Sequence, residues 1–240
     1  MAVDILAFAA HPDDIEITCG GLLLTLKRRG YTTGGIDFTR GEFGSNGTVE
    51  ERQAECAAAT RILSLDHRSN FGFPDGKLSS FDLETMKAAA VRAIRTHTPR
   101  ILVLPDRKYR HPDHGMVAKV GYEAHFYAGL MNYLPEMPPY RPKLVIYAPY
   151  NRRYHPSFIV DVSDVVEEKL EAIKAYRSQL FTGDTKADTP LSHRNFIDRI
   201  RASMMHYGSM ANVAYGEPYL MESPPAVTDV ISAFGLSAKK

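Results

Sequence analysis

The chain contains short, almost wholly apolar runs that are followed by polar loops and then by residues with helical spacing. The first run is Val3 to Ala9, and a second is Ile101 to Leu104. Neither run alternates with polar residues, which is typical of strands buried on both faces of a parallel sheet. After the first run, apolar residues recur at helical spacing from Ile17 until a basic turn that ends at Gly30. This order predicts an α/β fold of Rossmann-like type, with a mainly parallel open sheet flanked by helices.

The same alternation continues along the rest of the chain. We expect further strands near residues 34–39, 68–71, 144–147 and 158–162, and helices over residues 49–64, 82–97, from 114 onwards, 163–179 and 195–207. Thr48 and Glu51 form a capping-box signature for the helix at 49–64, and Ser163 is the expected cap of the helix that runs to 179. Residues 181–190 are expected to form a loop, and the last residues an irregular tail. We expect residues 1–240 to form a single domain, because no change in composition divides the chain.

Two similar polar tetrads follow the apolar runs. His11 to Asp14 reads His-Pro-Asp-Asp, and His111 to His114 reads His-Pro-Asp-His. One His-Pro-Asp tripeptide is most often a turn, since proline fixes φ and aspartate accepts backbone hydrogen bonds. Two copies behind two strands favour a functional site, because ligands of open α/β sheets bind outside the carboxyl ends of the strands. We therefore expect an active site at the carboxyl edge, with one metal centre assembled from both tetrads.

The residue types in the tetrads suit a hydrolytic metal site, which needs about three protein ligands and an open position for water. His11, Asp14 and His114 would supply that set. Two histidines and one carboxylate suit Zn²⁺, although the same arrangement also serves Fe²⁺. The sequence therefore predicts a divalent metal without choosing between these two.

The other three ionisable residues of the tetrads have candidate roles in catalysis. Asp13 is placed to take a proton from water whose pKa the metal has lowered, and we assign it as general base. His111 could stabilise an oxyanion or, if charged, protonate a leaving amine. Asp113 could orient a histidine imidazole that binds the metal, without contacting the metal itself.

Arg52 and Asp75 are two further candidates, each with a simpler interpretation. Arg52 stands in the first turn after a glycine-rich loop at 40–47, where its planar fork could reach a polar ligand, but such a residue is ordinarily solvated. Asp75 is most simply a turn residue, unless a sugar hydroxyl lies nearby. The glycines of the loop lack the G-x-G-x-x-G spacing of a dinucleotide-binding protein.

Composition and charge argue against several classes of partner. The formal charge is only +1, so a strong electrostatic attraction for nucleic acid is unsupported. No apolar run reaches the roughly 18 residues of a membrane span. Cys19 and Cys56 fit neither a zinc knuckle nor a redox motif and are interpreted as reduced packing residues, which favours a cytoplasmic location.

The tetrads and their surroundings resemble the LmbE-like or PIG-L-like metal-dependent N-acetylglucosamine deacetylases. The pattern Ala-His-Pro-Asp-Asp-x-Glu is matched at 10–16 and His-Pro-Asp-His at 111–114. Further agreement lies at residues 39–42, at Arg52 with Glu55, at Asn70 with 74–76, and at 176–179 and 189–191. The chain looks most like the bacillithiol-pathway branch, which deacetylates N-acetylglucosaminyl malate to the free amine.

The resemblance implies roles for the same residues. It implies Zn²⁺ bound by His11, Asp14 and His114, Asp13 as base and His111 at the oxyanion. It also suggests substrate contacts at three positions: Arg52 and Asp75 near sugar hydroxyls, and Arg110 near the carboxylates of the aglycone. Two positions depart from the family pattern: Tyr109 stands where relatives often have an acidic residue, and Phe196 where that branch often has a tyrosine thought to assist the oxyanion.

The resulting expectation is a zinc-dependent hydrolase acting on a small-molecule N-acetyl amino sugar conjugate, with N-acetylglucosaminyl malate as the first substrate to test. Two alternatives stay open: a deacetylase of another N-acetyl sugar such as a chitooligosaccharide, and a sugar-binding or metal-binding homologue without catalysis. We expect a homo-oligomer, because relatives often assemble and residues 126–140 are rich in aromatics and proline.

Overall fold

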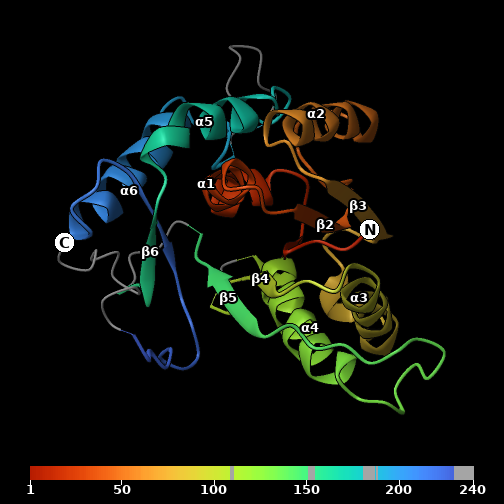
Figure 1. Ribbon diagram of the computed structural model, residues 1–240. Helices are drawn as coiled ribbons and strands as arrows, with labels where there is room; N and C mark the ends of the chain where they lie inside the picture. The colour runs from red at the N-terminus through yellow and green to blue at the C-terminus, as the bar shows by residue number, and fades with distance from the viewer. Residues whose placement is uncertain (109–110, 151–154, 181–186, 188, 230–240) are drawn as a thin grey trace.

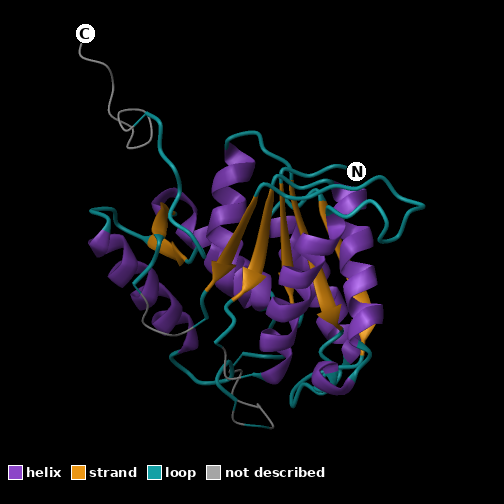
Figure 2. Ribbon diagram, turned by 90° about the horizontal axis from the view of Figure 1, so that it is seen from below, coloured by secondary structure: helices purple, strands orange, loops and turns teal. Residues whose placement is uncertain are grey.

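The larger sheet of the protein has five parallel strands. In the computed structural model, which describes residues 1–108, 111–150, 155–180, 187 and 189–229, their order is β3-β2-β1-β4-β5. The strands are β1 (Ile5–Ala9), β2 (Thr33–Thr39), β3 (His67–Phe73), β4 (Ile101–Pro105) and β5 (Leu144–Ala148). Figure 2 shows their arrowheads at one edge. The predicted α/β fold with a mainly parallel sheet is confirmed.

Helices cover both faces of this sheet (Figure 1). On one face lie α1 (Asp14–Arg28), α2 (Val49–Ile62) and α5 (Val166–Lys174), and on the other α3 (Leu83–His97) and α4 (Pro112–Ala128). Two separate hydrophobic clusters fill the two layers, with Ile5, Leu23 and Leu170 in one and Leu6, Val91 and Val120 in the other. Burial on both faces explains why the apolar run of β1 does not alternate.

The two tetrads follow neighbouring strands. Ile5 of β1 pairs with Ile101 of β4, although these residues are far apart in the sequence. The chain leaves β1 in one direction for β2 and β3 and returns on the other side of β1 for β4, so the strand order reverses between β1 and β4. Such a reversal opens a crevice at the carboxyl edge, and the tetrads border it where the chain passes into α1 and α4.

The C-terminal part differs from the sequence expectation in two respects. The predicted irregular tail contains β7 (Gly216–Tyr219), which pairs antiparallel with β6 (Phe158–Asp161) in a second sheet beside α6 (Phe196–Met210). The predicted helix over 163–179 is a 3₁₀ turn (Ser163–Val165) followed by α5, which ends at Lys174. Ser163 does not cap α5, because its hydroxyl donates to the Asp161 carboxylate at 2.6 Å.

The starts of the other helices are close to expectation. Thr48 and Glu51 form both hydrogen bonds of the predicted capping box at α2. Helix α4 begins at Pro112 rather than His114, with His111 as N-cap and proline in the first turn. A short 3₁₀ turn (Leu78–Ser80) precedes α3. Among the residues that the structure describes, no helix is long and apolar enough to cross a membrane, and Cys19 and Cys56 are both unpaired.

Candidate metal centre and active site

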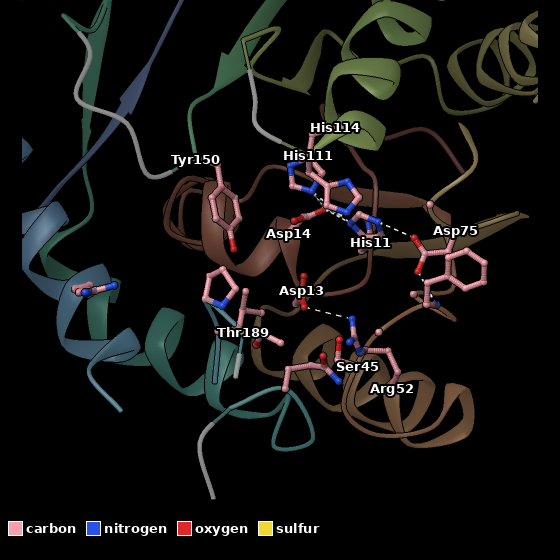
Figure 3. Close-up of a pocket in the computed structure, with 18 residues that line it drawn as sticks. His11, Asp13, Asp14, Ser45, Arg52, Asp75, His111, His114, Tyr150 and Thr189 are labelled. Atoms are coloured by element: carbon pink, nitrogen blue, oxygen red, sulfur yellow. Dashed lines mark hydrogen bonds and ion pairs between the residues drawn. The ribbon is translucent and has the colours of Figure 1, made fainter. Parts of the chain in front are cut away.

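Three side chains from the two tetrads converge at the carboxyl edge. His114 Nε2 lies 3.2 Å from Asp14 Oδ2 and 3.3 Å from His11 Nδ1, and His11 Nδ1 lies 3.4 Å from Asp14 Oδ2. Asp14 opens α1 and His114 lies in the first turn of α4, so the two helix starts and the loop after β1 bring the donors together. The expected convergence of these two loops is present (Figure 3).

The donor triangle has the dimensions of one face of a small tetrahedral metal site. A tetrahedral Zn²⁺ with ligands at 2.0–2.2 Å places neighbouring ligand atoms about 3.3 Å apart. The three measured edges, 3.2 to 3.4 Å, match this value. Two imidazoles and a carboxylate also suit Fe²⁺, so the three donors could hold either metal.

Asp13 is held in a strained position between the two candidate ligands of its own tetrad. Its φ is 117°, in the left-handed region that residues other than glycine rarely adopt, and it stands at the N-cap of α1. Its carboxylate receives a hydrogen bond from Arg52 Nη1 at 3.3 Å, and the same nitrogen donates to Pro12 O at 3.1 Å. Burial raises the pKa of Asp13 to about 8, although the positive charge of Arg52 opposes this shift.

The glycine-rich loop lies directly over Arg52. A Cβ atom at Gly41 would lie 3.0 Å from Arg52 Nη1, and one at Gly44 would lie 3.0 Å from Arg52 Nη2. Gly41 also has a φ of 70°, which favours glycine. The loop therefore packs its backbone against the guanidinium that contacts Asp13, and Arg52 is 5% exposed rather than solvated.

Asp75 contacts a proposed metal ligand. Its Oδ1 lies 2.9 Å from His11 Nε2, and its Oδ2 accepts from the backbone N–H of Phe43 at 2.8 Å. Asp113 lies farther from His11 Nε2, at 3.6 Å, and accepts from the backbone of Gly76 at 2.7 Å. With the Nε2 proton donated to Asp75, the Nδ1 lone pair of His11 faces Asp14 and His114, as a metal ligand requires.

His111 lies beside the donor triangle, and one of its nitrogens is already engaged. Its Nδ1 accepts from the backbone N–H of Asp113 at 3.3 Å, so the proton of the neutral ring belongs on Nε2. Burial lowers the pKa of His111, and the neighbouring His11 and His114 lower it further. The ring centroids of His11 and His111 are 4.8 Å apart. A neutral His111 can therefore donate one hydrogen bond from Nε2.

Except for the fully buried Asp113, these side chains line one end of a cavity of about 940 Å³. Its volume lies at the upper end of the range of pockets that enclose drug-sized ligands, so it exceeds what one sugar ring requires. The other lining residues are Gly41, Phe43, Gly44, Ser45, Gly76, Tyr150, Gln179, Thr189, Pro190, Leu191 and Arg199.

Comparison with known proteins identifies the family. The sequence profile of PIG-L, described as GlcNAc-PI de-N-acetylase, matches residues 6–125, which contain both tetrads. The chain belongs to the PIG-L family. Relatives in this family are deacetylases, which hydrolyse amide bonds, and the chain is an enzyme of the same class.

Three similar proteins match this chain over most of their length. Diacetylchitobiose deacetylase of Thermococcus kodakarensis is 28% identical over 228 residues, covering 89% of this chain and 80% of the archaeal protein. The crystal structure of a conserved protein from Thermus thermophilus, TT1542, is 36% identical, with a TM-score of 0.85, and covers 94% of this chain and 97% of that one. N,N'-diacetylchitobiose deacetylase from Pyrococcus horikoshii shares the fold at 24% identity, with a TM-score of 0.79 over 92% of this chain and 83% of that one.

The structure places the remaining predicted residues of this PIG-L protein as follows. Arg110 and Tyr109 lie outside the described residues. Phe196 is 2% exposed in the core and is absent from the described lining of the cavity. Tyr150, which the sequence did not suggest, lines the cavity with its ring edge-on to His114 at 5.7 Å between centroids. From the sequence, Tyr150 could have been suspected only because it follows the carboxyl end of a predicted strand, where ligands bind in such sheets.

Proposed function

We propose that this PIG-L family enzyme removes the acetyl group from a small N-acetylglucosamine conjugate, with Zn²⁺ held by His11, Asp14 and His114. The observation that carries the proposal is the donor triangle, whose edges of 3.2 to 3.4 Å match a tetrahedral site, with Asp13 beside it in the cavity. The known activities of relatives support the same reaction, because the Thermococcus kodakarensis protein deacetylates diacetylchitobiose and a Streptomyces fradiae relative deacetylates 2'-N-acetylparomamine.

Asp13 and His111 have different tasks in the proposed reaction: Asp13 transfers a proton, and His111 donates a hydrogen bond. When bound, the metal polarises the amide carbonyl and lowers the pKa of a water molecule. Asp13 takes a proton from the attacking water, and Arg52 Nη1, which donates to its carboxylate at 3.3 Å, holds that carboxylate beside the donor triangle. His111 donates from Nε2 to the carbonyl oxygen as that oxygen gains negative charge. The proton held by Asp13 then reaches the departing amine, so that acetate and a free amino sugar leave.

Arg52 and Asp75 have roles in this proposal that differ from a direct contact with sugar hydroxyls. Arg52 holds the carboxylate of Asp13 from the side of the glycine-rich loop. Asp75 fixes the tautomer of His11. Each still lines the cavity, so a contact with substrate through their remaining accessible atoms stays a prediction.

Two variants test the catalytic assignment. Asp13→Ala should retain about one metal ion per chain and lose acetate release, whereas His114→Ala should lose the metal. The exposed residues Asp198 and His206 offer matched controls, and their alanine variants should retain both metal and turnover. Metal content by mass spectrometry and acetate by enzymatic assay provide the readouts. If Asp13→Ala deacetylated as fast as the wild type, Asp13 would not be the base.

The metal is tested by reloading the metal-free protein with Zn²⁺ or Fe²⁺ separately. We expect zinc to restore acetate release. Restoration by iron alone would identify the arrangement as an iron site. No acetate release with either metal, from any conjugate, would favour the alternative of a binding protein without catalysis.

The substrate is tested by comparing N-acetylglucosaminyl malate with a chitooligosaccharide. The first is proposed from the resemblance to the bacillithiol-pathway branch, and the second from the diacetylchitobiose deacetylase relative. The cavity of about 940 Å³ has room for the second half of either conjugate. A higher kcat/KM on the malate conjugate would support the first, and a higher value on diacetylchitobiose would replace it.

We also propose a homo-oligomer that acts in the cytoplasm. Phe126 is 52% and Met131 is 73% exposed, and both lie in the segment expected to form an interface. The unpaired thiols of Cys19 and Cys56 suit a reducing compartment. Analytical ultracentrifugation would measure the assembly, and a monomer at micromolar concentration would contradict it.

A further inference from the structure

Arg199 is a charged residue of the cavity that the proposed reaction does not use. It lies on α6, and its side chain lines the cavity whose other end holds His11, Asp14 and His114. In Figure 3 the blue ribbon of α6 lies beyond Tyr150, on the side away from His11 and Asp75. Arg199 therefore belongs to the part of the cavity that the metal centre does not fill.

The charges at the metal end of the cavity are paired with one another. Arg52 contacts Asp13, and Asp75 contacts His11. Asp14 lies against His11 and His114, and a bound dication would complete that balance. Among the lining residues that the structure describes, the positive charge that is left over belongs to Arg199.

Arg199 makes neither an ion pair nor a side-chain hydrogen bond within the part of the chain that the structure describes, and it is exposed. Its position is nevertheless fixed by the helix that carries it. Phe196, Ile200 and Met204 anchor one face of α6 in the core. Asp198 precedes Arg199 but is absent from the described lining of the cavity. A guanidinium at this end of the cavity can form two parallel hydrogen bonds with two oxygens of an anionic group.

We propose that Arg199 binds a negatively charged group on the aglycone of the substrate and so selects anionic conjugates over neutral ones. The inference rests on the proposed function, because the acetamide must lie at the metal end for the far end of the molecule to face α6. The ligand chemistry is a carboxylate or a phosphate, which present the same paired acceptor oxygens to arginine.

The test compares two conjugates that differ only in charge: an N-acetylglucosamine conjugate with a dicarboxylate aglycone, and its neutral dimethyl ester. In the zinc-loaded wild type, kcat/KM should be higher for the charged conjugate. In Arg199→Ala the ratio of the two kcat/KM values should fall about tenfold or more, the size expected for a charge-assisted hydrogen bond. Arg199→Lys should give an intermediate ratio, because it keeps the charge and loses the planar fork.

Arg201 provides the matched control. It lies two residues further along α6 and forms an ion pair with Glu167 at 2.6 Å, and it is absent from the described lining of the cavity. Arg201→Ala removes the same charge from the same helix and should keep the wild-type ratio. A phosphate-bearing conjugate in the same series identifies which anion is preferred. Equal losses on the charged and neutral conjugates, or an unchanged ratio in Arg199→Ala, would overturn the proposal.

Calorimetric binding of the two conjugates separates this inference from the proposed reaction. Loss of the preference for the charged conjugate in Arg199→Ala would support the role of Arg199 even if no acetate were released. A preference that persists in the variant would overturn it. Absence of acetate release from every conjugate would contradict the proposed deacetylation, but not the role of Arg199 in binding.

Discussion

His11 Nε2 lies 2.9 Å from Asp75 Oδ1, on the opposite side of the imidazole from the nitrogen that faces Asp14 and His114. Asp75 is itself fixed by Phe43 N–H, which donates to its Oδ2, and its backbone N–H donates to Glu42. A carboxylate in this position orients a metal-binding imidazole and raises its basicity. The turn that carries Asp75 therefore belongs to the candidate metal centre.

The first prediction concerns this carboxylate. Asp75→Ala should weaken zinc binding about 10- to 100-fold, because His11 loses the acceptor that fixes its tautomer. Competition with a chromophoric chelator would measure the affinity. Asp82→Ala is a suitable control, because Asp82 caps α3 far from the metal ligands and should affect stability without changing zinc affinity. Unchanged zinc affinity in Asp75→Ala would contradict the role assigned here.

The second prediction concerns the glycine-rich loop. Gly44→Ala should lower kcat while the metal stays bound, because the new methyl group would lie 3.0 Å from Arg52 Nη2 and 3.0 Å from Gly41 O. The guanidinium must shift by a few tenths of an ångström, which disturbs its hydrogen bond to Asp13. Gly20→Ala, whose Cβ would meet neighbours at 3.5 Å, is the control and should leave kcat near wild type. Steady-state rates with parallel metal analysis would show whether turnover alone is lost.

Patterns within short segments predicted the five strands of the larger sheet, β6 and most helices, and they indicated the candidate metal donors. The apolar run of β1 and the tetrad behind it follow from local periodicity and from the rule that sites lie at the carboxyl edge. His114 converges with His11 because β4 pairs with β1. The alternation of strands and helices led us to expect both strands in one parallel sheet. The elements follow from local patterns, and the one long-range pairing that the site needs, β1 with β4, follows from a general rule of α/β folds.

Features that depend on particular long-range contacts were not predictable. Gly216–Tyr219 contains glycine and proline, which disfavour strands, and forms β7 only because β6 supplies a partner far back in the chain. Asp75 reaches His11 because Asp113 fixes the following turn through Gly76 N–H. Arg199 belongs to no motif, and only the packing of α6 places it in the cavity.

The third prediction concerns two imidazoles that lie against one another at the amino edge of the sheet, with their planes tilted by 40°. The rings of His67 and His97 are 4.1 Å apart, and burial lowers the pKa of His67, with further lowering by the charge of His97. A lowered pKa means that the folded state binds fewer protons than the unfolded state as pH falls below about 6.5. The free energy of unfolding should therefore decrease as pH falls through that range. His67→Gln should reduce this dependence in urea titrations at pH 7.5 and 5.5, and an identical pH dependence in the variant would contradict the assignment.

The last prediction concerns the buried ion pair between α5 and β7. Lys169 Nζ lies 2.5 Å from Glu217 Oε1, and both side chains are 2% exposed. Glu217 also accepts from the backbone N–H groups of Gly21 and Leu22, at 2.8 and 2.7 Å, and a Cβ atom at Gly21 would lie 2.6 Å from its carboxylate. This carboxylate therefore joins the second sheet to α1, the helix that begins with Asp14.

Glu217→Ala should lower the free energy of unfolding by about 3–5 kcal/mol, because it leaves a buried ammonium without its partner and supplies no compensating acceptor. Glu167→Ala removes a carboxylate from the solvent-exposed pair with Arg201 and should cause a much smaller loss. Urea unfolding followed by circular dichroism would measure both variants. A double variant, Lys169→Met with Glu217→Leu, should recover part of the loss, because no buried charge then remains unpaired. If Glu217→Ala were no more destabilising than Glu167→Ala, the carboxylate would not be the link between β7 and α1.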